Sequence, residues 1–167
     1  MNNHSFIRRG VFHMSKIAYV GNMDEWKDEF SFSFPIKVRF SETDMFGHLN
    51  NTVPFTYFEQ ARIEYFKSLG MMQDWVNTNH ETIPVVADLQ CDFLSQVFFD
   101  EKLDIKVKAH KVGNSSVDIH YLGVREDGTP CFTGRGTIVQ ISRFTGKPVK
   151  WTNEMKDLFA EGFQKQL

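Results

Sequence analysis

Residues Val38 to Gly70 read VRFSETDMFGHLNNTVPFTYFEQARIEYFKSLG, and they join the end of a strand, a polar loop and a long helix. We predict the helix over Thr52 to Leu69, because its apolar residues recur at spacings of three and four. They are Phe58, Ala61, Tyr65 and Leu69. Polar residues occupy the opposite side, so one face of the helix should be buried and the other solvated.

The ends of this helix carry recognisable signals. Gly70 is a suitable C-cap, and Asn50 or Asn51 is a suitable N-cap. Pro54 is acceptable near the start, because the first helical turn has no internal partner for the N–H that proline lacks.

Strands surround the helix in the sequence. Phe32 to Phe40 alternates with a period of two, and Pro35 within it favours an edge position. Further alternating runs cover 85–93, 103–109, 117–121 and about 133–142, and turn signals separate them at Gly113-Asn114 and Asp127-Gly128. A closing amphipathic helix, with Met155, Leu158, Phe159 and Phe163 on one side, is expected over Thr152 to Gln166. The fold class is therefore α+β, with about five antiparallel strands, one long helix and a short C-terminal helix.

The chain of 167 residues has the length of about one domain. We assign residues 31–167 to a single domain and residues 1–30 to an N-terminal extension, because the extension shows no clean period. At least the first dozen residues are expected to be loosely held, and Met14 is an alternative translation start to Met1.

Composition excludes several classes of function. A net charge of -2 argues against nucleic acid as the main partner, and no apolar run approaches the roughly 18 residues of a membrane span. The two cysteines, Cys91 and Cys131, form no disulfide framework and fit buried strand positions better than a nucleophile's role. With no secretory signal recognisable, the cytoplasm is the expected compartment. Neither metal-ligand spacing nor a nucleotide-binding motif is present, so we expect no metal and no such cofactor.

The loop before the long helix is dense in polar groups. Asp44 precedes the helix start, and Gly47 permits a tight turn that folds the carboxylate back toward the helix. Free N–H groups there could stabilise negative charge on a carbonyl oxygen, while the carboxylate attacks an ester-like carbonyl or activates water. The alternative is structural: Asp44, Asn50 and Asn51 would then serve only turns and caps.

The stretches VRFSETDMFGHLNN and YFEQARIEYFKSLG resemble the hotdog-fold acyl-CoA thioesterases of the 4-hydroxybenzoyl-CoA thioesterase type. The resemblance covers Val38 to Gly70 closely and fits the later strand order over about Ile83 to Ser142. It implies a curved antiparallel sheet wrapped around the long helix, two chains paired into a continuous sheet, and active sites at their interface. Pro54 departs from the family, in which an aromatic residue is common at this position.

The resemblance also implies roles for individual residues. Asp44 would be the catalytic carboxylate, as nucleophile or general base, and the backbone N–H near Asn51 would polarise the thioester carbonyl. His48 and Asn50 belong to the G-H-x-N-N motif, whose side chains would order water or the carbonyl. Glu59 is a further candidate, because some relatives carry a catalytic glutamate on this helix. Its spacing to Arg62 favours an ion pair instead.

The implied activity is hydrolysis of an acyl-CoA to a carboxylic acid and coenzyme A. Three alternatives stay open: an acyl-carrier-protein thioesterase, a non-catalytic acyl-CoA-binding module, and a hotdog dehydratase. A single helix covers only part of a five-stranded sheet, so the remaining apolar surface predicts a homodimer or homotetramer.

Overall fold

The structure is a computed structural model that describes residues 17–164. The expectations for the first dozen residues and for Met14 lie outside this range. So does the end of the predicted closing helix, and the side chain of Phe163 is also outside the described part.

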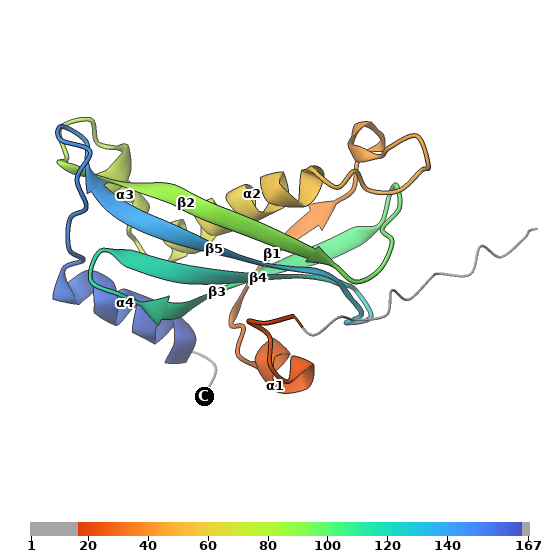
Figure 1. The fold of residues 1–167 in the computed structure, drawn as a ribbon. Helices are drawn as coiled ribbons and strands as arrows, with labels where there is room; N and C mark the ends of the chain where they lie inside the picture. Colours follow the sequence, from red (N-terminus) through yellow and green to blue (C-terminus); the bar gives the residue numbers. More distant parts are fainter. Residues whose placement is uncertain (1–16, 165–167) are drawn as a thin grey trace, which may run out of the picture.

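Five antiparallel strands form one sheet in the order β1-β3-β4-β5-β2. Their bounds are β1 Phe32–Lys37, β2 Thr82–Phe93, β3 Lys102–Val112, β4 Ser116–Arg125 and β5 Pro130–Ser142. The sheet curves around helix α2, Val53–Ser68, which lies across its concave face (Figure 1). The predicted α+β architecture is confirmed. Pro35 lies in β1, which is at the edge of the sheet. An edge strand has a neighbour on one side only, so it tolerates the N–H that proline lacks.

Helix α2 packs its predicted apolar face on the sheet. The Phe58 and Ala61 side chains are completely buried, and Tyr65 is nearly so. Phe58 lies directly over Gly134 of β5, where an added Cβ would come within 2.4 Å of the Phe58 ring. The glycine therefore allows the helix to approach the sheet closely, and this approach sets the position of the helix N-terminus.

The start of α2 differs from the prediction. The N-cap is Thr52 rather than Asn50 or Asn51, although the Asn50 side chain accepts a hydrogen bond from the Thr52 N–H at 3.0 Å. The prediction was wrong because an asparagine side chain can bond to the N–H two residues later in an Asx turn as well as in an N-cap. The sequence signal is the same in both cases. Pro54 lies in the first turn, as expected, and Gly70 follows the helix with a φ of 75°.

Two short helices lie at one end of the sheet, and the second is the predicted closing helix. Helix α3, Met72–Val76, was not predicted, because five residues are too few to show a period. Its Trp75 is buried against Phe66 of α2, with ring centroids 5.2 Å apart. Helix α4, Asn153–Gln164, buries Phe159 against the same core. These elements close the end of the concave core that lies far from the Asp44 loop (Figure 1).

Residues 17–30 pack on the outer face of the sheet, opposite α2. They include helix α1, Met23–Asp28, whose Asn22 caps it through bonds from the N–H groups of Asp24 and Glu25. Trp26 and Phe30 bury their rings on this face against Leu122 and Val124, the outward-facing residues of β4. The sheet is therefore covered on both sides at this point.

A polar cluster lies beneath α1. His120 of β4 is completely buried, and its Nδ1 accepts a hydrogen bond from Trp26 Nε1 at 3.0 Å. The His120 ring stacks on His110 with centroids 4.2 Å apart, and the Lys108 ammonium, which pairs with Glu29, lies over the Trp26 ring. Burial, together with the adjacent His110, lowers the pKa of His120 to about 4.

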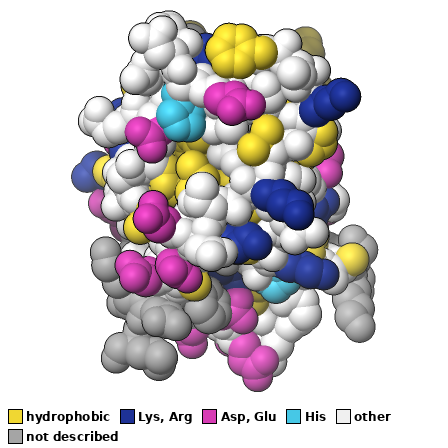
Figure 2. Space-filling model, turned by 90° about the vertical axis from the view of Figure 1, so that its left-hand side faces the viewer, with side chains coloured by type: hydrophobic (Ala, Val, Ile, Leu, Met, Phe, Trp, Pro, Cys, Tyr) yellow, Lys and Arg dark blue, Asp and Glu magenta, His cyan; other side chains and the backbone are white. Residues whose placement is uncertain are grey.

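None of the described helices is both long and apolar enough to cross a bilayer. Figure 2 shows the end of the molecule that carries α3 and the start of α4, where basic side chains lie mostly at the centre and right and acidic ones mostly at the left and bottom. This face presents no broad field of positive charge, in keeping with the overall charge of -2.

The His120 cluster predicts a dependence of stability on pH. Between pH 6.5 and about 4 the unfolded chain binds a proton at His120 that the folded chain does not, so this contribution is complete above pH 6.5 and is lost as the pH falls toward 4. The loss is on the order of 3 kcal/mol. Urea unfolding at pH 7.5 and pH 5 measures the part of it that is lost above pH 5, about 2 kcal/mol. In His120→Gln, whose amide oxygen can still accept from Trp26, the difference between the two pH values should shrink; an unchanged difference would contradict the prediction.

Candidate active site

Asp44 is fixed by the turn that it begins. Its Oδ1 accepts hydrogen bonds from the N–H groups of Phe46, at 2.8 Å, and His48, at 3.2 Å. The Asp44 N–H donates to the His48 carbonyl at 2.8 Å, and Gly47 takes a φ of 77°, which closes the turn. One carboxylate oxygen is therefore held, while Oδ2 makes no hydrogen bond with any described residue.

A pocket of about 170 Å³ lies beside this carboxylate. Its lining comes from the loop before α2, the end of β2 and the segment after it, and β5. The lining residues are Asp44, His48, Leu49, Asn51, Phe93, Ser95, Gln96, Val97 and Phe132. The half-buried carboxylate thus borders a small pocket with several apolar walls, where a charge interacts more strongly than in open water.

Asn51 lines the same pocket, and its backbone N–H has no partner among the described residues. The N–H groups of Asn50, Thr52 and Val53 all donate hydrogen bonds, to Glu42, to the Asn50 side chain and to the Asn50 carbonyl respectively. No acceptor within the described chain takes the Asn51 N–H. This donor can therefore bind the oxygen of a polarised carbonyl.

Glu42 connects the loop to α2. Its Oε2 accepts hydrogen bonds from Tyr57 Oη, at 2.6 Å, and from the Arg39 N–H, at 2.7 Å, and its carbonyl accepts from Asn50. Burial, reinforced by the Glu42 carboxylate, raises the pKa of Tyr57, so the phenol remains a donor. These bonds fix the loop relative to the helix N-terminus.

Sequence reasoning missed the wall supplied by residues 93–97. The Leu49 N–H donates to the Val97 carbonyl at 2.7 Å, which joins this wall to the Asp44 loop. Buried Arg125 holds the segment from the other side through Ser95 Oγ and the Gln96 carbonyl. The Gln96 side chain makes no hydrogen bond within the described residues and lines the pocket. No local motif marks these residues, because they meet Asp44 only through strand pairing.

The predicted site residues separate into two groups. Asp44, His48 and Asn51 line one pocket, and the His48 ring packs edge-on against Phe98, with centroids 5.1 Å apart. The Asn50 side chain is engaged in the Asx turn at the helix start and is absent from the pocket lining.

Glu59 lies away from this pocket, in the middle of α2. It makes no ion pair with Arg62 within the subunit, although their spacing favours one. Arg62 instead turns inward and donates to Tyr121 Oη.

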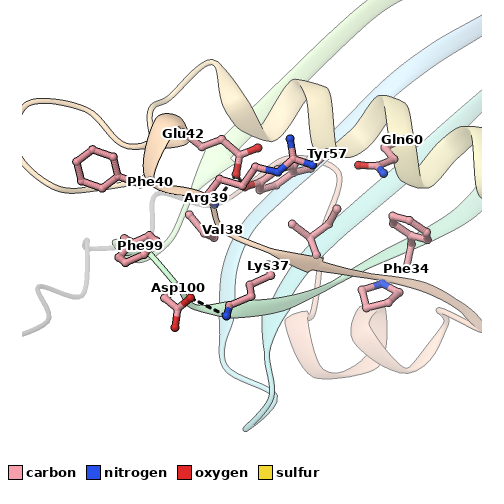
Figure 3. A pocket seen from close by; sticks show the side chains of 12 residues that line it. Phe34, Lys37, Val38, Arg39, Phe40, Glu42, Tyr57, Gln60, Phe99 and Asp100 are labelled. Carbon is pink, nitrogen blue, oxygen red and sulfur yellow. Dashed lines mark hydrogen bonds and ion pairs between the residues drawn. The ribbon is translucent and has the colours of Figure 1, made fainter.

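A larger cavity, of about 580 Å³, lies elsewhere in the structure. It lies between β1 and the first turns of α2, and its aromatic walls include Phe34, Tyr57 and Phe99 (Figure 3). Lys37 and Asp100 form an ion pair at 2.7 Å at this cavity, and Glu42 Oε2 accepts a hydrogen bond from Tyr57. Its lining shares no residue with that of the Asp44 pocket, and it contains neither Asp44 nor Asn51.

Comparison with known proteins identifies relatives over most of the chain. A sequence model of the thioesterase-like superfamily matches residues 38–159. The chain is 54% identical over 133 residues to YsmA of Bacillus subtilis (strain 168), an uncharacterized protein, covering 80% of this chain and 88% of YsmA. It is 27% identical over 86 residues to the acyl-CoA thioesterase YbgC of Haemophilus influenzae, covering 52% of this chain and 63% of YbgC.

Solved structures share the fold. The DHNA-CoA thioesterase from Staphylococcus aureus superposes with a TM-score of 0.65 at 26% identity, covering 80% of this chain and 88% of that one.

The cysteines are predicted to be unreactive in the folded protein. Burial raises the pKa of Cys91 to about 12 and also raises the pKa of Cys131, so at pH 8 both remain thiols rather than nucleophilic thiolates. An aromatic disulfide reagent should therefore react with neither on the time scale of minutes, and with both after unfolding in guanidinium. Rapid reaction of a thiol in the folded protein would contradict this expectation.

Proposed function

The chain belongs to the thioesterase-like superfamily and has its hotdog fold, and from this premise we propose that it hydrolyses acyl-CoA thioesters to a free carboxylic acid and coenzyme A. Membership of the 4-hydroxybenzoyl-CoA type is part of the proposal. So is the cytoplasmic location. The observation that carries the proposal is that two residues line one pocket: Asp44, whose Oδ2 has no partner among the described residues, and Asn51, whose backbone N–H has none either.

Asp44 is assigned to the attack on the thioester. As a general base, its Oδ2 takes a proton from water while the water oxygen bonds to the carbonyl carbon. As a nucleophile, Oδ2 bonds to that carbon itself, and water later hydrolyses the mixed anhydride. In both routes the carbon–sulfur bond breaks, the thiolate leaves as coenzyme A, and a proton from the water neutralises it.

The Asn51 N–H is assigned to the carbonyl oxygen. During the attack this oxygen gains negative charge, and a donor already in position stabilises the charge without reorganisation. The N-terminal end of α2 adds its positive dipole end at the same place. His48 and Gln96 border the pocket and are assigned to ordering water or the carbonyl.

A homodimer or homotetramer is part of the proposed function. Strand β2 is at the sheet edge and pairs only with β5 among the described strands, so its outer side can receive a second strand. Val86 and Ala87 on this strand are exposed. Pairing of two β2 strands would continue the sheet across both subunits and cover these apolar residues.

Replacement of Asp44 tests the catalytic assignment. Asp44→Asn and Asp44→Ala should lower the rate of thiol release from acyl-CoA by about 10² to 10⁴-fold, because the base or nucleophile is lost. Asp157→Asn, at an exposed position on α4, is the matched control and should leave the rate unchanged. Circular dichroism and sedimentation confirm fold and assembly. Near-normal turnover by a folded Asp44 variant would contradict the assignment.

A screen of substrates defines the activity further. Thiol release should occur from at least one member of a panel of short, long and aromatic acyl-CoAs. The same acyl group on an acyl carrier protein tests the carrier. Binding of acyl-CoA without thiol release, or hydration of an enoyl-CoA, would instead support the non-catalytic or dehydratase alternatives.

A further inference from the structure

Arg62 is a buried cation without a carboxylate. Its side chain is on the inward part of α2 and only 7% of the residue is exposed. Its single hydrogen bond within the described residues runs from Nη1 to the Tyr121 phenol at 3.0 Å. Its other nitrogens bond to no described residue and are not among the fully enclosed unpaired atoms, so they open into the space beside them. Enclosing them against another surface would be costly unless an anion paired with them.

The remaining donors of Arg62 have room to receive an anion. Arg62 lines a pocket of about 210 Å³ between α2 and β2, together with Ile63, Val85 and Val86. The Asp44 pocket shares no residue with it. An anion that reached Arg62 here would be surrounded by apolar side chains, where a charge-assisted hydrogen bond to a guanidinium is strong.

Glu59 is an acidic side chain that lacks a basic partner. It is exposed at the rim of the same pocket, one turn before Arg62, and makes no ion pair or hydrogen bond with any described residue. The other glutamate on the helix, Glu64, pairs with Lys67 of its own subunit at 2.7 Å. One face of α2 therefore presents an unpaired acid and an unpaired base side by side.

We propose that this face binds a second copy of the chain, with Glu59 of each subunit pairing with Arg62 of the other. In a two-fold symmetric interface, a contact from one subunit to the other occurs twice, once in each direction. An acid and a base on the same patch can therefore form two equivalent ion pairs between the subunits. The inference rests on the dimer of the proposed function, since the open edge of β2 borders the same pocket.

The charges favour a second copy over a small anionic ligand. A ligand carboxylate would satisfy Arg62 but would leave Glu59 unpaired at the mouth of the pocket, where it would repel the ligand. A second copy supplies one acid and one base, and it also covers the exposed apolar residues of β2.

Sedimentation across a concentration series tests the pair. Glu59→Gln should raise the dimer dissociation constant at least about ten-fold, because Arg62 of the partner then remains buried without an anion. Glu64→Gln is the matched control, since its partner lies in the same subunit, and it should leave the constant unchanged. Glu59 is exposed, so its replacement should not disturb folding.

A double variant separates a direct pair from a general charge effect. Adding Arg62→Met to Glu59→Gln should weaken the dimer no further, or should strengthen it, because removing the unpaired cation removes the penalty. Additive weakening by the two changes, or equal weakening by Glu64→Gln, would overturn the pair.

Two further outcomes would also overturn the inference. One is a wild-type chain that remains monomeric at tens of micromolar. The other is a dimer that is indifferent to Glu59→Gln and binds benzoate, used as a small carboxylate probe, only when Arg62 is present. Thiol release measured on the same samples keeps this inference separate from the proposed activity: an active monomer would remove only the interface, and an inactive dimer with the expected Glu59 effect would remove only the activity.

Discussion

The turn that starts at Asp44 binds its own carboxylate, and the candidate chemistry depends on this interaction. Two backbone N–H groups hold Oδ1, so the carboxylate cannot swing into solvent, while Oδ2 remains without a partner among the described residues. A carboxylate with both oxygens bonded would be only a cap, and one with neither bonded would have no fixed direction. The turn itself depends on Gly47, whose positive φ other residues rarely adopt.

The rest of the fold serves to bring the helix N-terminus to this turn. Close packing of Phe58 on Gly134 fixes how near α2 lies to the sheet, and the bond between Tyr57 and Glu42 ties the loop to the helix. Pairing of Leu49 with Val97 then adds the opposite wall. The position of the Asn51 N–H thus depends on core packing some distance away. The geometry of this small pocket therefore depends on the packing of the whole sheet.

Periodic patterns predicted the strands and α2, because each of these buries one regular face, while the Asp44 loop was singled out by its polar residues and by the family resemblance. The same reasoning failed where burial is not periodic. Helix α1 is six residues long and its packing depends on two aromatic rings, while Gln96 reaches the pocket through a pairing between distant segments. Spacing alone suggested an ion pair between Glu59 and Arg62, but Arg62 turns inward, since its aliphatic stem and Tyr121 offer it a buried position.

Residues 17–30 have a consequence for how copies of the chain could stack. Sheets often associate back to back through their uncovered faces, but here Trp26 and Phe30 already occupy the outer face over β4. Another sheet could settle there only by displacing them and breaking the bond between Trp26 and His120. Residues 17–30 therefore occupy a surface that a second copy of the chain would otherwise contact. Removing them would change the number of subunits that associate without altering the Asp44 pocket.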